Sequence, residues 1–298
     1  MVIINVAGGL GNQLQQYALY RKFLSLGIEA RLDTSWFCGI NHSGAITKRN
    51  LELDFFEQIK YQVITAEEKK KLIGSDGLSG KLRRKLLPST VNIFHESDIY
   101  HPEILSFTNM YLYGYFACDK YYADILPELR MEIKFKRSDM ILNYVVAEEM
   151  RVTDSVAVHI RRGDYLTPEN QKIFGNICTD KYYETAIDYI SQRHPKSMFF
   201  FFSDDLEYVR EKFTGLRYKY IDFNYGMDSI YDLYLMSNCK HIICANSTFS
   251  FWGARLNNNP KKIMIRPARH KNTQPIDPSV LLPLWQGWTL IDNEGLIL

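Results

Sequence analysis

Short runs of apolar, β-branched and aromatic residues alternate with segments of helical periodicity along most of the chain. Near the amino terminus, the run Val2 to Val6 predicts a strand, and the apolar spacing from Leu14 to Leu26 predicts a helix that ends at Gly27. Ile28 to Asp33 is the next predicted strand. Because strands that alternate with helices form crossover units, this pattern predicts an α/β fold with a parallel sheet.

The rest of the first half is less regular. Helical spacing predicts helices over 66–73 and 119–129, and the apolar run 110–116 predicts a strand. An amphipathic helix is predicted over 138–150, and we expect it to connect two halves of the chain.

The second half alternates more cleanly, and each predicted strand is followed by polar or small residues. Strands are predicted at 156–160, 198–202, 218–223, 241–245 and 262–266, the last of which is expected to close the sheet. Helices are predicted at 181–193, after Asp204 with Glu207 as a capping pair, at 229–239 and at 249–256. Ligands of open parallel sheets bind beyond the carboxyl ends of the strands, so we expect the functional residues there.

The length of 298 residues suggests two domains at about 150 residues each. Together with the connecting helix, this predicts a first domain over 1–150 and a second over 151–298. The composition, 46% hydrophobic and 23% charged, is that of a packed globular protein.

Charge and cysteine content restrict the partners and the compartment. The formal net charge of +2 provides no bulk positive field for a nucleic acid. The five cysteines form no close framework, and their odd number suits a reducing compartment, so we expect free thiols. The first residues do not resemble a signal peptide and no apolar run approaches membrane-spanning length, so we expect a cytoplasmic protein.

A glycine turn follows the first predicted strand. Gly8, Gly9 and Gly11 lie before a helix start, where exposed N–H groups could bind an anion. The dinucleotide-binding fingerprint needs a third small residue where Leu14 stands, although Asp33 is placed to bind a ribose. The glycines alone are equally explained by a tight turn that needs positive φ.

Two adjacent arginines follow the strand 156–160. Arg161 and Arg162 cannot both be buried without anionic partners, their forked donors match phosphate oxygens, and Gly163 allows close backbone approach. The alternative is a surface ion pair with Asp164, and His159 in isolation is more often a core histidine.

Hydroxyl residues end the strand 241–245. Ser247 and Thr248 could donate to phosphate alongside the N–H groups of the following helix, or one of them could simply cap that helix. Asp232, on the preceding helix, is likewise either a site residue or part of a capping box with Ser229.

These pieces together resemble glycosyltransferase family 11, the α-1,2-fucosyltransferases of bacteria. The matching segments are 8–13 (GGLGNQ), 159–165 (HIRRGDY), 202–205 (FSDD) and 246–254 (NSTFSFWGA). The resemblance covers residues 1 to about 268. It implies a GT-B-like fold, in which two Rossmann-type halves face each other across a cleft.

The resemblance also implies the reaction. GDP-β-L-fucose would be the donor, and L-fucose would pass with inversion to the 2-hydroxyl of a terminal galactoside, with no metal and no cofactor. Residues 1–150 would be the acceptor side and 151–298 the donor side. Peripheral association with the inner face of a membrane is compatible with this role.

The site residues are carried over one by one. Arg162 would hold the β-phosphate, with Arg161 in support, and Asp232 would bind the guanine edge. Ser247 and Thr248 would contact the phosphates. No carboxylate pair with metal-binding spacing is evident, since Asp204 and Asp205 are adjacent, so the departing GDP would be neutralised by arginines, hydroxyls and helix dipoles.

The remaining roles are less closely tied to a motif. His159 would line the donor pocket, and Asn12 would face the donor from the amino-terminal half, where Gly9 and Gly11 would also contact it. Asp164 is the candidate general base, against its alternative role as an ion-pair partner of the arginines.

Two other function classes stay open at this point. An NAD(P)-dependent Rossmann-fold oxidoreductase would use the glycine turn and Asp33 as its cofactor site. A non-catalytic nucleotide- or sugar-binding module would keep the glycines and aromatic residues but has no need of paired arginines at a strand end.

Overall fold

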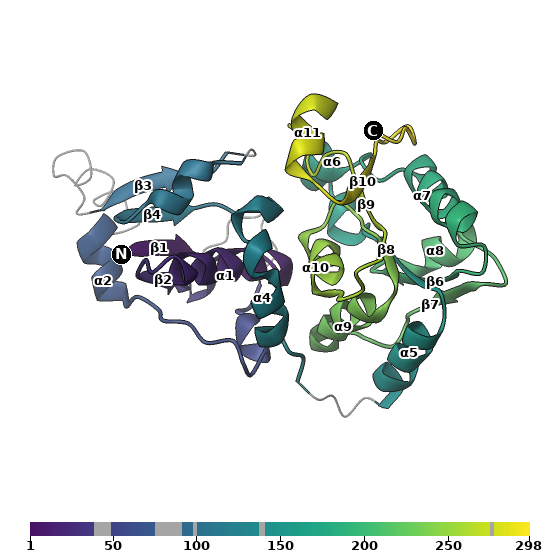
Figure 1. The fold of residues 1–298 in the computed structure, drawn as a ribbon, viewed down its shortest axis with the longest axis horizontal. Coiled ribbons are helices and arrows are strands. Elements are labelled where there is room, and N and C mark those ends of the chain that lie inside the picture. Colours follow the sequence, from purple (N-terminus) through teal and green to yellow (C-terminus); the bar gives the residue numbers. More distant parts are fainter. Residues whose placement is uncertain (39–48, 75–90, 98–99, 137–140, 275–276) are drawn as a thin grey trace. The chain divides into compact units, whose positions relative to one another are not determined.

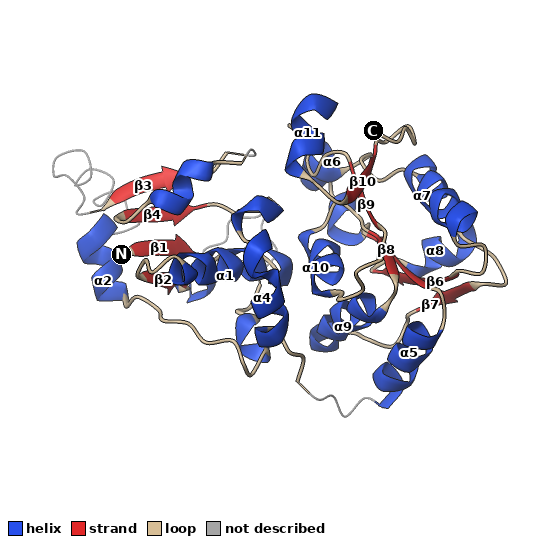
Figure 2. Cartoon of the chain, viewed as in Figure 1, coloured by secondary structure: helices blue, strands red, loops and turns tan. Residues whose placement is uncertain are grey.

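The chain folds into two compact α/β units, 1–134 and 135–298. The computed structural model describes residues 1–38, 49–74, 91–97, 100–136, 141–274 and 277–298 (Figure 1). In each unit, helices connect the strands of a parallel sheet (Figure 2). This confirms the predicted α/β fold of two Rossmann-type halves, whereas their placement across a cleft stays a prediction.

The division lies after Lys134 and not after residue 150. Helix α5 (Ile141–Val152) belongs to the second unit, because its residues Ala147 and Met150 are fully buried in that unit's core. Phe135 also contacts Tyr234 of the second unit edge to face. The predicted connecting helix is therefore part of one core, and its first residues, 138–140, lie outside the described residues.

The first unit contains a four-stranded parallel sheet in the order β2-β1-β4-β3. Its strands are β1 (Val2–Asn5), β2 (Ala30–Asp33), β3 (Asn92–His95) and β4 (Met110–Tyr113). Its helices are α1 (Leu10–Ser25), α2 (Ala66–Ile73) and α4 (Leu126–Glu132). Helix α1 packs on β1 and β2, which places its amino terminus at the carboxyl edge of the sheet.

The structure of this unit differs from the predicted elements in two places. The helix predicted over 119–129 is formed by two 3₁₀ turns, Asp119–Tyr121 and Ala123–Ile125, followed by α4. Pro127 explains the break, because its ring lacks an N–H and favours the start of a helix over its interior. Strand β3 was not predicted, since it is a largely exposed edge strand without a clear alternation of polar and apolar residues.

The second unit contains a six-stranded parallel sheet in the order β10-β9-β8-β5-β6-β7. Its strands are β5 (Ser155–Ile160), β6 (Met198–Ser203), β7 (Tyr218–Tyr220), β8 (His241–Ile243), β9 (Met264–Pro267) and β10 (Trp288–Ile291). Besides α5, its helices are α6 (Pro168–Phe174), α7 (Asp180–Arg193), α8 (Leu206–Lys212), α9 (Ile230–Asn238), α10 (Thr248–Leu256) and α11 (Pro278–Leu284).

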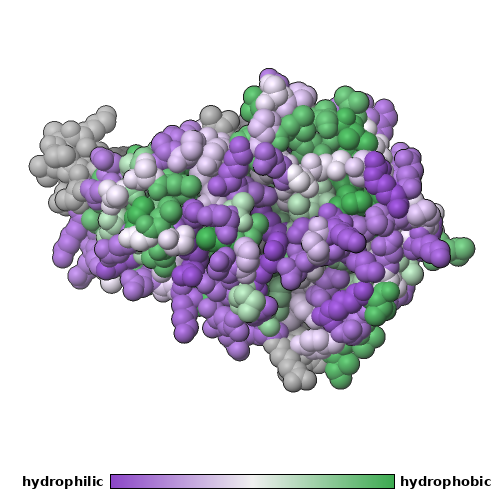
Figure 3. All heavy atoms as spheres, viewed as in Figure 1, coloured by the Kyte–Doolittle hydropathy of each residue, from purple (hydrophilic) through white to green (hydrophobic). Residues whose placement is uncertain are grey.

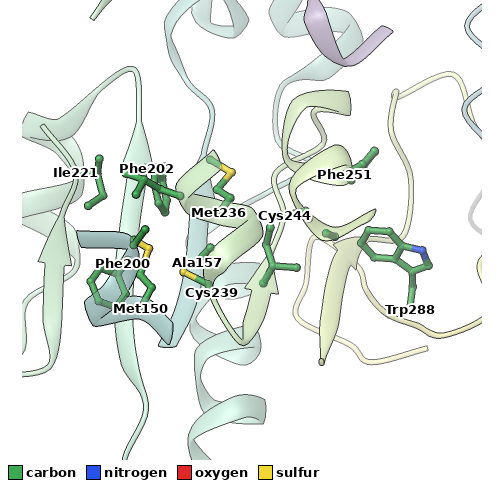
Figure 4. Close-up of a cluster of buried hydrophobic side chains, with 14 of the residues drawn as sticks. Met150, Ala157, Phe200, Phe202, Ile221, Met236, Cys239, Cys244, Phe251 and Trp288 are labelled. Carbon is green, nitrogen blue, oxygen red and sulfur yellow. The ribbon is translucent and has the colours of Figure 1, made fainter. Parts of the chain in front are cut away.

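Helices cover both faces of this sheet. Ala157, Phe200 and Phe202 point towards α5, α9 and α10, where they pack with Met150 and Met236 (Figure 4). The intervening strand residues form a second cluster with α7 and α8, which contains Val156, Val158, Ile160, Phe199 and Phe201. Because no strand face is left for water, β5 and β6 are continuous apolar runs, as the sequence indicated.

The edge of the second sheet was predicted incorrectly. The run 262–266 does not close the sheet, because β10 pairs in parallel with β9 beyond it. Residues 280–291 are almost continuously apolar, so their sequence has no period that separates helix α11 from strand β10. Helix α6 was not predicted either. Residues 81–85, a run rich in lysine and arginine, lie outside the described residues.

The face drawn in Figure 3 is largely hydrophilic, with scattered apolar areas such as the one near α11. Val280 and Leu282 are the exposed apolar side chains of that helix. Among the described residues, no helix has both the length and the apolar character needed to cross a membrane. The five cysteines are free thiols, as expected.

Gly253 allows α10 to pack closely on α9. A Cβ atom at this position would lie 3.0 Å from Met236 Cβ and 3.2 Å from Ile242 Cδ1. We expect Gly253→Val to lower the free energy of unfolding by about 1–3 kcal/mol, because a branched side chain overpacks this contact. Urea unfolding measures the change. Gly253→Ala is the control and should change stability less, since about 1 kcal/mol of helix propensity opposes the crowding; equal stability of all three proteins would contradict this packing role.

Candidate active site

The second sheet has a topological switch point between β5 and β8. The chain proceeds outward from β5 to β6 and β7, and then returns to the other side of β5 to form β8, β9 and β10. In open parallel sheets the loops on either side of such a point diverge and leave a crevice for a ligand. The segments that follow β5 and β8, residues 161–163 and 246–248, flank this point.

The two arginines after β5 are held by carboxylates in different ways. Arg161 forms ion pairs through both terminal nitrogens, with Asp164 Oδ1 at 2.6 Å and Asp204 Oδ2 at 2.8 Å. Arg162 donates from Nε to Asp205 Oδ2 at 2.8 Å, and its guanidinium lies 3.6 Å from the centroid of the Tyr208 ring. The hydrogen bond from Arg162 helps to hold the pKa of Asp205 below its usual range.

The two guanidiniums therefore differ in what they can offer to a ligand. Arg161 is committed to structure, because each terminal nitrogen already has a carboxylate. Arg162 donates from Nε to Asp205, and its guanidinium stacks on the ring of Tyr208. Its terminal nitrogens have no hydrogen-bond partner within the described part of the chain. Arg162 thus presents an oriented pair of charged donors, the arrangement that binds phosphate bidentately.

The carboxylates that hold the arginines come from the neighbouring strand, and sequence reasoning missed this role. Ile160 and Ser203 are paired in the β5–β6 register, so Asp204 and Asp205 emerge directly beside Arg161 and Arg162. The two motifs follow consecutive predicted strands, and this position was the indication in the sequence that their side chains could meet. Asp205, and not Asp204, caps α8, since its side chain accepts from the Tyr208 N–H.

Gly163 is required by the same network. A Cβ atom at this position would lie 2.3 Å from Asp204 Oδ2, inside the contact distance of the two atoms. The backbone N–H of Arg162 also donates to Asp204 Oδ1 at 2.9 Å. The glycine thus allows Asp204 to reach the backbone and Arg161 together.

Asp164 forms the ion pair that sequence analysis weighed against a role as general base. Its Oδ1 accepts from Arg161, and its backbone carbonyl accepts from Asn170 Nδ2 at 2.9 Å. The structure therefore shows the positioning contact, and the role of Asp164 in proton transfer stays a prediction.

The hydroxyls after β8 are not used to cap the following helix. Ser247 occupies the N-cap position of α10, but its side chain makes no capping hydrogen bond. Neither the Ser247 nor the Thr248 hydroxyl has a partner among the residues that the structure describes. The structural alternative of a simple cap is therefore wrong, and both hydroxyls can serve a ligand at the helix amino terminus.

His159 is buried near the end of β5 with one nitrogen unsatisfied. Its Nδ1 is inaccessible to solvent and has no hydrogen-bond partner in the described residues. Burial and the nearby positive charge of Arg161 lower the pKa of His159 to about 3, so the ring is neutral at physiological pH. An unpaired buried polar nitrogen is costly, which favours a hydrogen bond to a ligand.

Asp232 lies in the first turn of α9 and is not part of a capping box. Ser229 precedes the helix without a side-chain capping bond, and its hydroxyl donates instead to the Gly226 carbonyl. Asn224 Nδ2 donates to Asp232 Oδ1 at 2.8 Å and is itself paired with the Asn143 amide. Burial raises the pKa of Asp232 to about 7, although the Asn224 hydrogen bond opposes this rise.

The glycine turn lies at the carboxyl edge of the first unit. Gly8 adopts φ 85°, and a Cβ there would lie 2.5 Å from Asn12 Nδ2, so this position needs glycine for its backbone and for the Asn12 side chain. Gly9 is the extended N-cap residue of α1, and Gly11 is buried in the first turn. The positive φ thus belongs to Gly8, and the donor contacts predicted for Gly9, Gly11 and Asn12 stay predictions.

Two internal carboxylates occupy the positions that a dinucleotide would need. The backbone N–H of Leu10, at the start of α1, opposes the rise in the pKa of the Glu52 carboxyl that burial causes, so this carboxylate lies at the helix start. Asp33 is fully buried and bonded to the Tyr111 hydroxyl, the Ser35 N–H and Lys69. The hydrogen bonds and Lys69 lower the pKa of Asp33 against the opposing effect of burial. Asp33 is therefore a structural residue, which removes the support for a nicotinamide site.

One cluster could offer metal ligands, at the other edge of the second sheet. Ligand atoms of Asp154, His194 and His241 lie within 4.8 Å of one another, before β5, after α7 and at the start of β8. His241 Nδ1 accepts the Ile263 N–H at 3.0 Å, so in the neutral ring Nε2 carries the proton and faces Asp154. A ligating imidazole instead donates from its second nitrogen, so this arrangement fits a hydrogen-bond network better than a metal site.

Comparison with known proteins relates the whole chain to glycosyltransferases. The family described as "Glycosyl transferase family 11" matches residues 92–288. An α-1,2-colitosyltransferase of Escherichia coli is 31% identical over 273 residues, which cover 90% of this chain and 91% of that protein. The O-antigen biosynthesis glycosyltransferase WbnK of Escherichia coli is 30% identical, over 89% of this chain and 93% of its own length.

Other similarities are more distant. The galactoside α-(1,2)-fucosyltransferase 1 of Saimiri sciureus is 32% identical over 103 residues, which cover 34% of this chain and 28% of the monkey protein. Among solved structures, the fucosyltransferase NodZ from Bradyrhizobium aligns with a TM-score of 0.45 at 15% identity, over 85% of this chain and 91% of NodZ. POFUT1 in complex with GDP-fucose aligns with a TM-score of 0.46 at 13% identity, over 88% and 97% of the two chains.

Proposed function

Because the chain belongs to glycosyltransferase family 11, we propose that it transfers L-fucose from GDP-β-L-fucose to the 2-hydroxyl of a terminal galactoside. The observation that carries the donor part is the oriented Arg162 fork beside β8, where hydroxyls and a helix amino terminus also lack acceptors. A nucleotide diphosphate supplies acceptor oxygens for all of these groups.

The donor base would be bound by Asp232. A carboxylate can accept both the N1–H and the exocyclic amine of guanine, which adenine cannot offer together. The Asn143–Asn224 pair holds Asp232 Oδ1 in place, so the carboxylate is oriented before the nucleotide arrives. Two further N–H donors would also stabilise the charged form that burial disfavours.

The reaction would proceed with inversion. The acceptor oxygen forms a bond to the anomeric carbon on the side opposite to the departing GDP, while the bond from that carbon to the β-phosphate oxygen breaks. Arg162 would stabilise the negative charge that develops on GDP, and Arg161 would keep its neighbour in position. The hydroxyl proton would pass to a carboxylate, for which Asp164 is the candidate.

A donor and acceptor panel tests the proposed function. The enzyme is incubated with GDP-fucose or GDP-colitose and a series of galactosides, and the products are identified by mass and linkage analysis. The expected product carries fucose in α linkage at the galactose 2-position. Exclusive use of GDP-colitose, or another linkage, would overturn the stated donor or regiochemistry, and GDP binding without turnover on any galactoside would favour the non-catalytic binding module.

Arg162 should tolerate no conservative replacement. A lysine cannot bond to Asp205, stack on Tyr208 and present a planar fork to phosphate at the same time. We expect Arg162→Lys and Arg162→Ala to lose roughly 2–4 kcal/mol of transition-state stabilisation, measured as kcat/KM. Arg210→Lys is the matched control, because Arg210 forms an exposed ion pair with Asp222. Near-normal turnover of Arg162→Lys would exclude the bidentate role.

Transfer should not depend on a divalent metal. No spaced carboxylate pair was found beside the arginines, and Asp204 and Asp205 are both engaged by guanidiniums. We therefore expect EDTA to leave the initial rate nearly unchanged. Loss of activity in EDTA with recovery by one specific metal would show that an ion takes part.

Asp232 should make donor binding depend on pH. Its pKa of about 7 means that the free enzyme is partly protonated there, whereas guanine needs the carboxylate, so GDP affinity should rise between about pH 6 and about pH 8. Calorimetric titration of GDP measures this. Asp232→Asn should bind GDP more weakly at every pH and lose the dependence, with KM for the donor raised more than kcat is lowered.

The control for Asp232 is Asp228→Asn, an exposed carboxylate on the preceding 3₁₀ turn. It should bind GDP as the unmodified enzyme does. If Asp232→Asn also keeps its GDP affinity, Asp232 has only a structural role.

A further inference from the structure

Arg269 is a third arginine at the carboxyl edge of the second sheet, and no motif drew attention to it. It follows β9, which lies beside β8, the strand that leads to Ser247 and Thr248. The side chain is half-buried, and its Nε is inaccessible to solvent without a hydrogen-bond partner. Within the described ranges, Arg269 forms neither an ion pair nor a hydrogen bond through its side chain.

The other arginines of this edge and strand have carboxylate or aromatic partners within the protein. Arg161 and Arg162 have carboxylates, and Arg266, on β9 itself, lies 3.6 Å from the centroid of the Trp285 ring and 4.3 Å from that of Phe251. A buried donor left without an acceptor costs about 1–3 kcal/mol, and more when it is charged. Arg269 thus differs from its neighbours in having neither a carboxylate nor an aromatic ring as a partner among the described residues.

The backbone around Arg269 is fixed, so the side chain is not part of a loose loop. Ala268 N–H donates to Ile291 O at 2.8 Å, and His270 N–H donates to Gln274 Oε1 at 2.8 Å. Asn246 Nδ2 donates to His270 O at 3.2 Å, which ties this segment to the one after β8. The fold therefore holds a half-buried arginine beside the segment that follows β8, as a preorganised ligand site would.

We propose that Arg269 binds the diphosphate of the nucleotide-sugar donor, as a second guanidinium that acts together with Arg162. The strands β5, β8 and β9 are adjacent, so Arg162 and Arg269 follow the two strands on either side of β8. Between them lie the unpartnered hydroxyls of Ser247 and Thr248 at the amino terminus of α10. A ligand that satisfies all these donors carries several anionic oxygens, as a diphosphate does.

This inference rests on the proposed donor and adds a residue to its recognition. Arg269 would contact phosphate oxygens in the bound donor and in the departing GDP, so it would contribute to donor affinity. It would have no contact with guanine, which is assigned to Asp232. The two halves of the nucleotide can therefore be tested separately.

Calorimetric titration of GDP, GMP and guanosine into Arg269→Ala and Arg269→Gln tests the assignment. Loss of a charge-assisted hydrogen bond should weaken GDP binding about tenfold or more. Guanosine affinity should stay unchanged, and Arg269→Lys should bind GDP with intermediate affinity because it keeps the charge. If Arg269→Ala melts at a lower temperature, Arg269→Gln, which keeps much of the side-chain length, provides the comparison.

Arg193→Ala is the matched control. Arg193 is exposed in the last turn of α7, which leads to the amino end of β6, so its loss removes the same charge from the opposite edge of the sheet. Unchanged GDP affinity in natively folded Arg269 variants would overturn this inference and leave the proposed donor intact. Equal losses for GDP and guanosine would also overturn it, whereas an unmodified enzyme that binds no GDP would exclude both the donor and this role.

Discussion

The balance of positive charge at the end of β5 is the constraint on which the rest of the site depends. Two guanidiniums at adjacent positions beside an apolar sheet require anionic partners, and these come from the loop itself and from the end of β6. Asp204 reaches Arg161 only because residue 163 has no side chain. The result is an asymmetric pair, in which one arginine is structural and the other keeps terminal donors for a ligand.

The two units differ in which of their polar groups lack a hydrogen-bond partner. In the first unit, the Glu52 carboxylate lies at the start of α1, and Asp33 is enclosed by hydrogen bonds and Lys69. In the second unit, donors that follow three adjacent strands have no acceptor among the described residues, and the Asp232 carboxylate accepts a hydrogen bond from Asn224. This distribution supports the proposed binding of a nucleoside diphosphate, whose phosphates accept hydrogen bonds and whose base donates them.

The hydrophobic pattern of the sequence was sufficient to predict the buried strands, but it missed the edge strands β3 and β10. Strands β5 and β6 are covered on both faces, so their apolar runs have one interpretation. Strand β3 is largely exposed, and β10 follows a helix of equally apolar composition, so neither has a distinguishing period. The predicted boundary between the units was misplaced, because the amphipathic pattern of α5 does not indicate which unit's core its apolar face covers.

By itself, the sequence determined that paired arginines, hydroxyls and Asp232 follow or precede recognisable strands and helices, and the family resemblance predicts that they bind phosphate and guanine. It could not decide between a structural role and a ligand-binding role, since a serine that caps a helix and a serine that binds a ligand are identical in the sequence. Only the tertiary structure decided that Ser247 caps nothing, that Asp33 is consumed internally and that Asp205 and Tyr208 orient Arg162. Only the tertiary structure could reveal Arg269, because whether a side chain has a partner depends on its folded surroundings and not on the sequence.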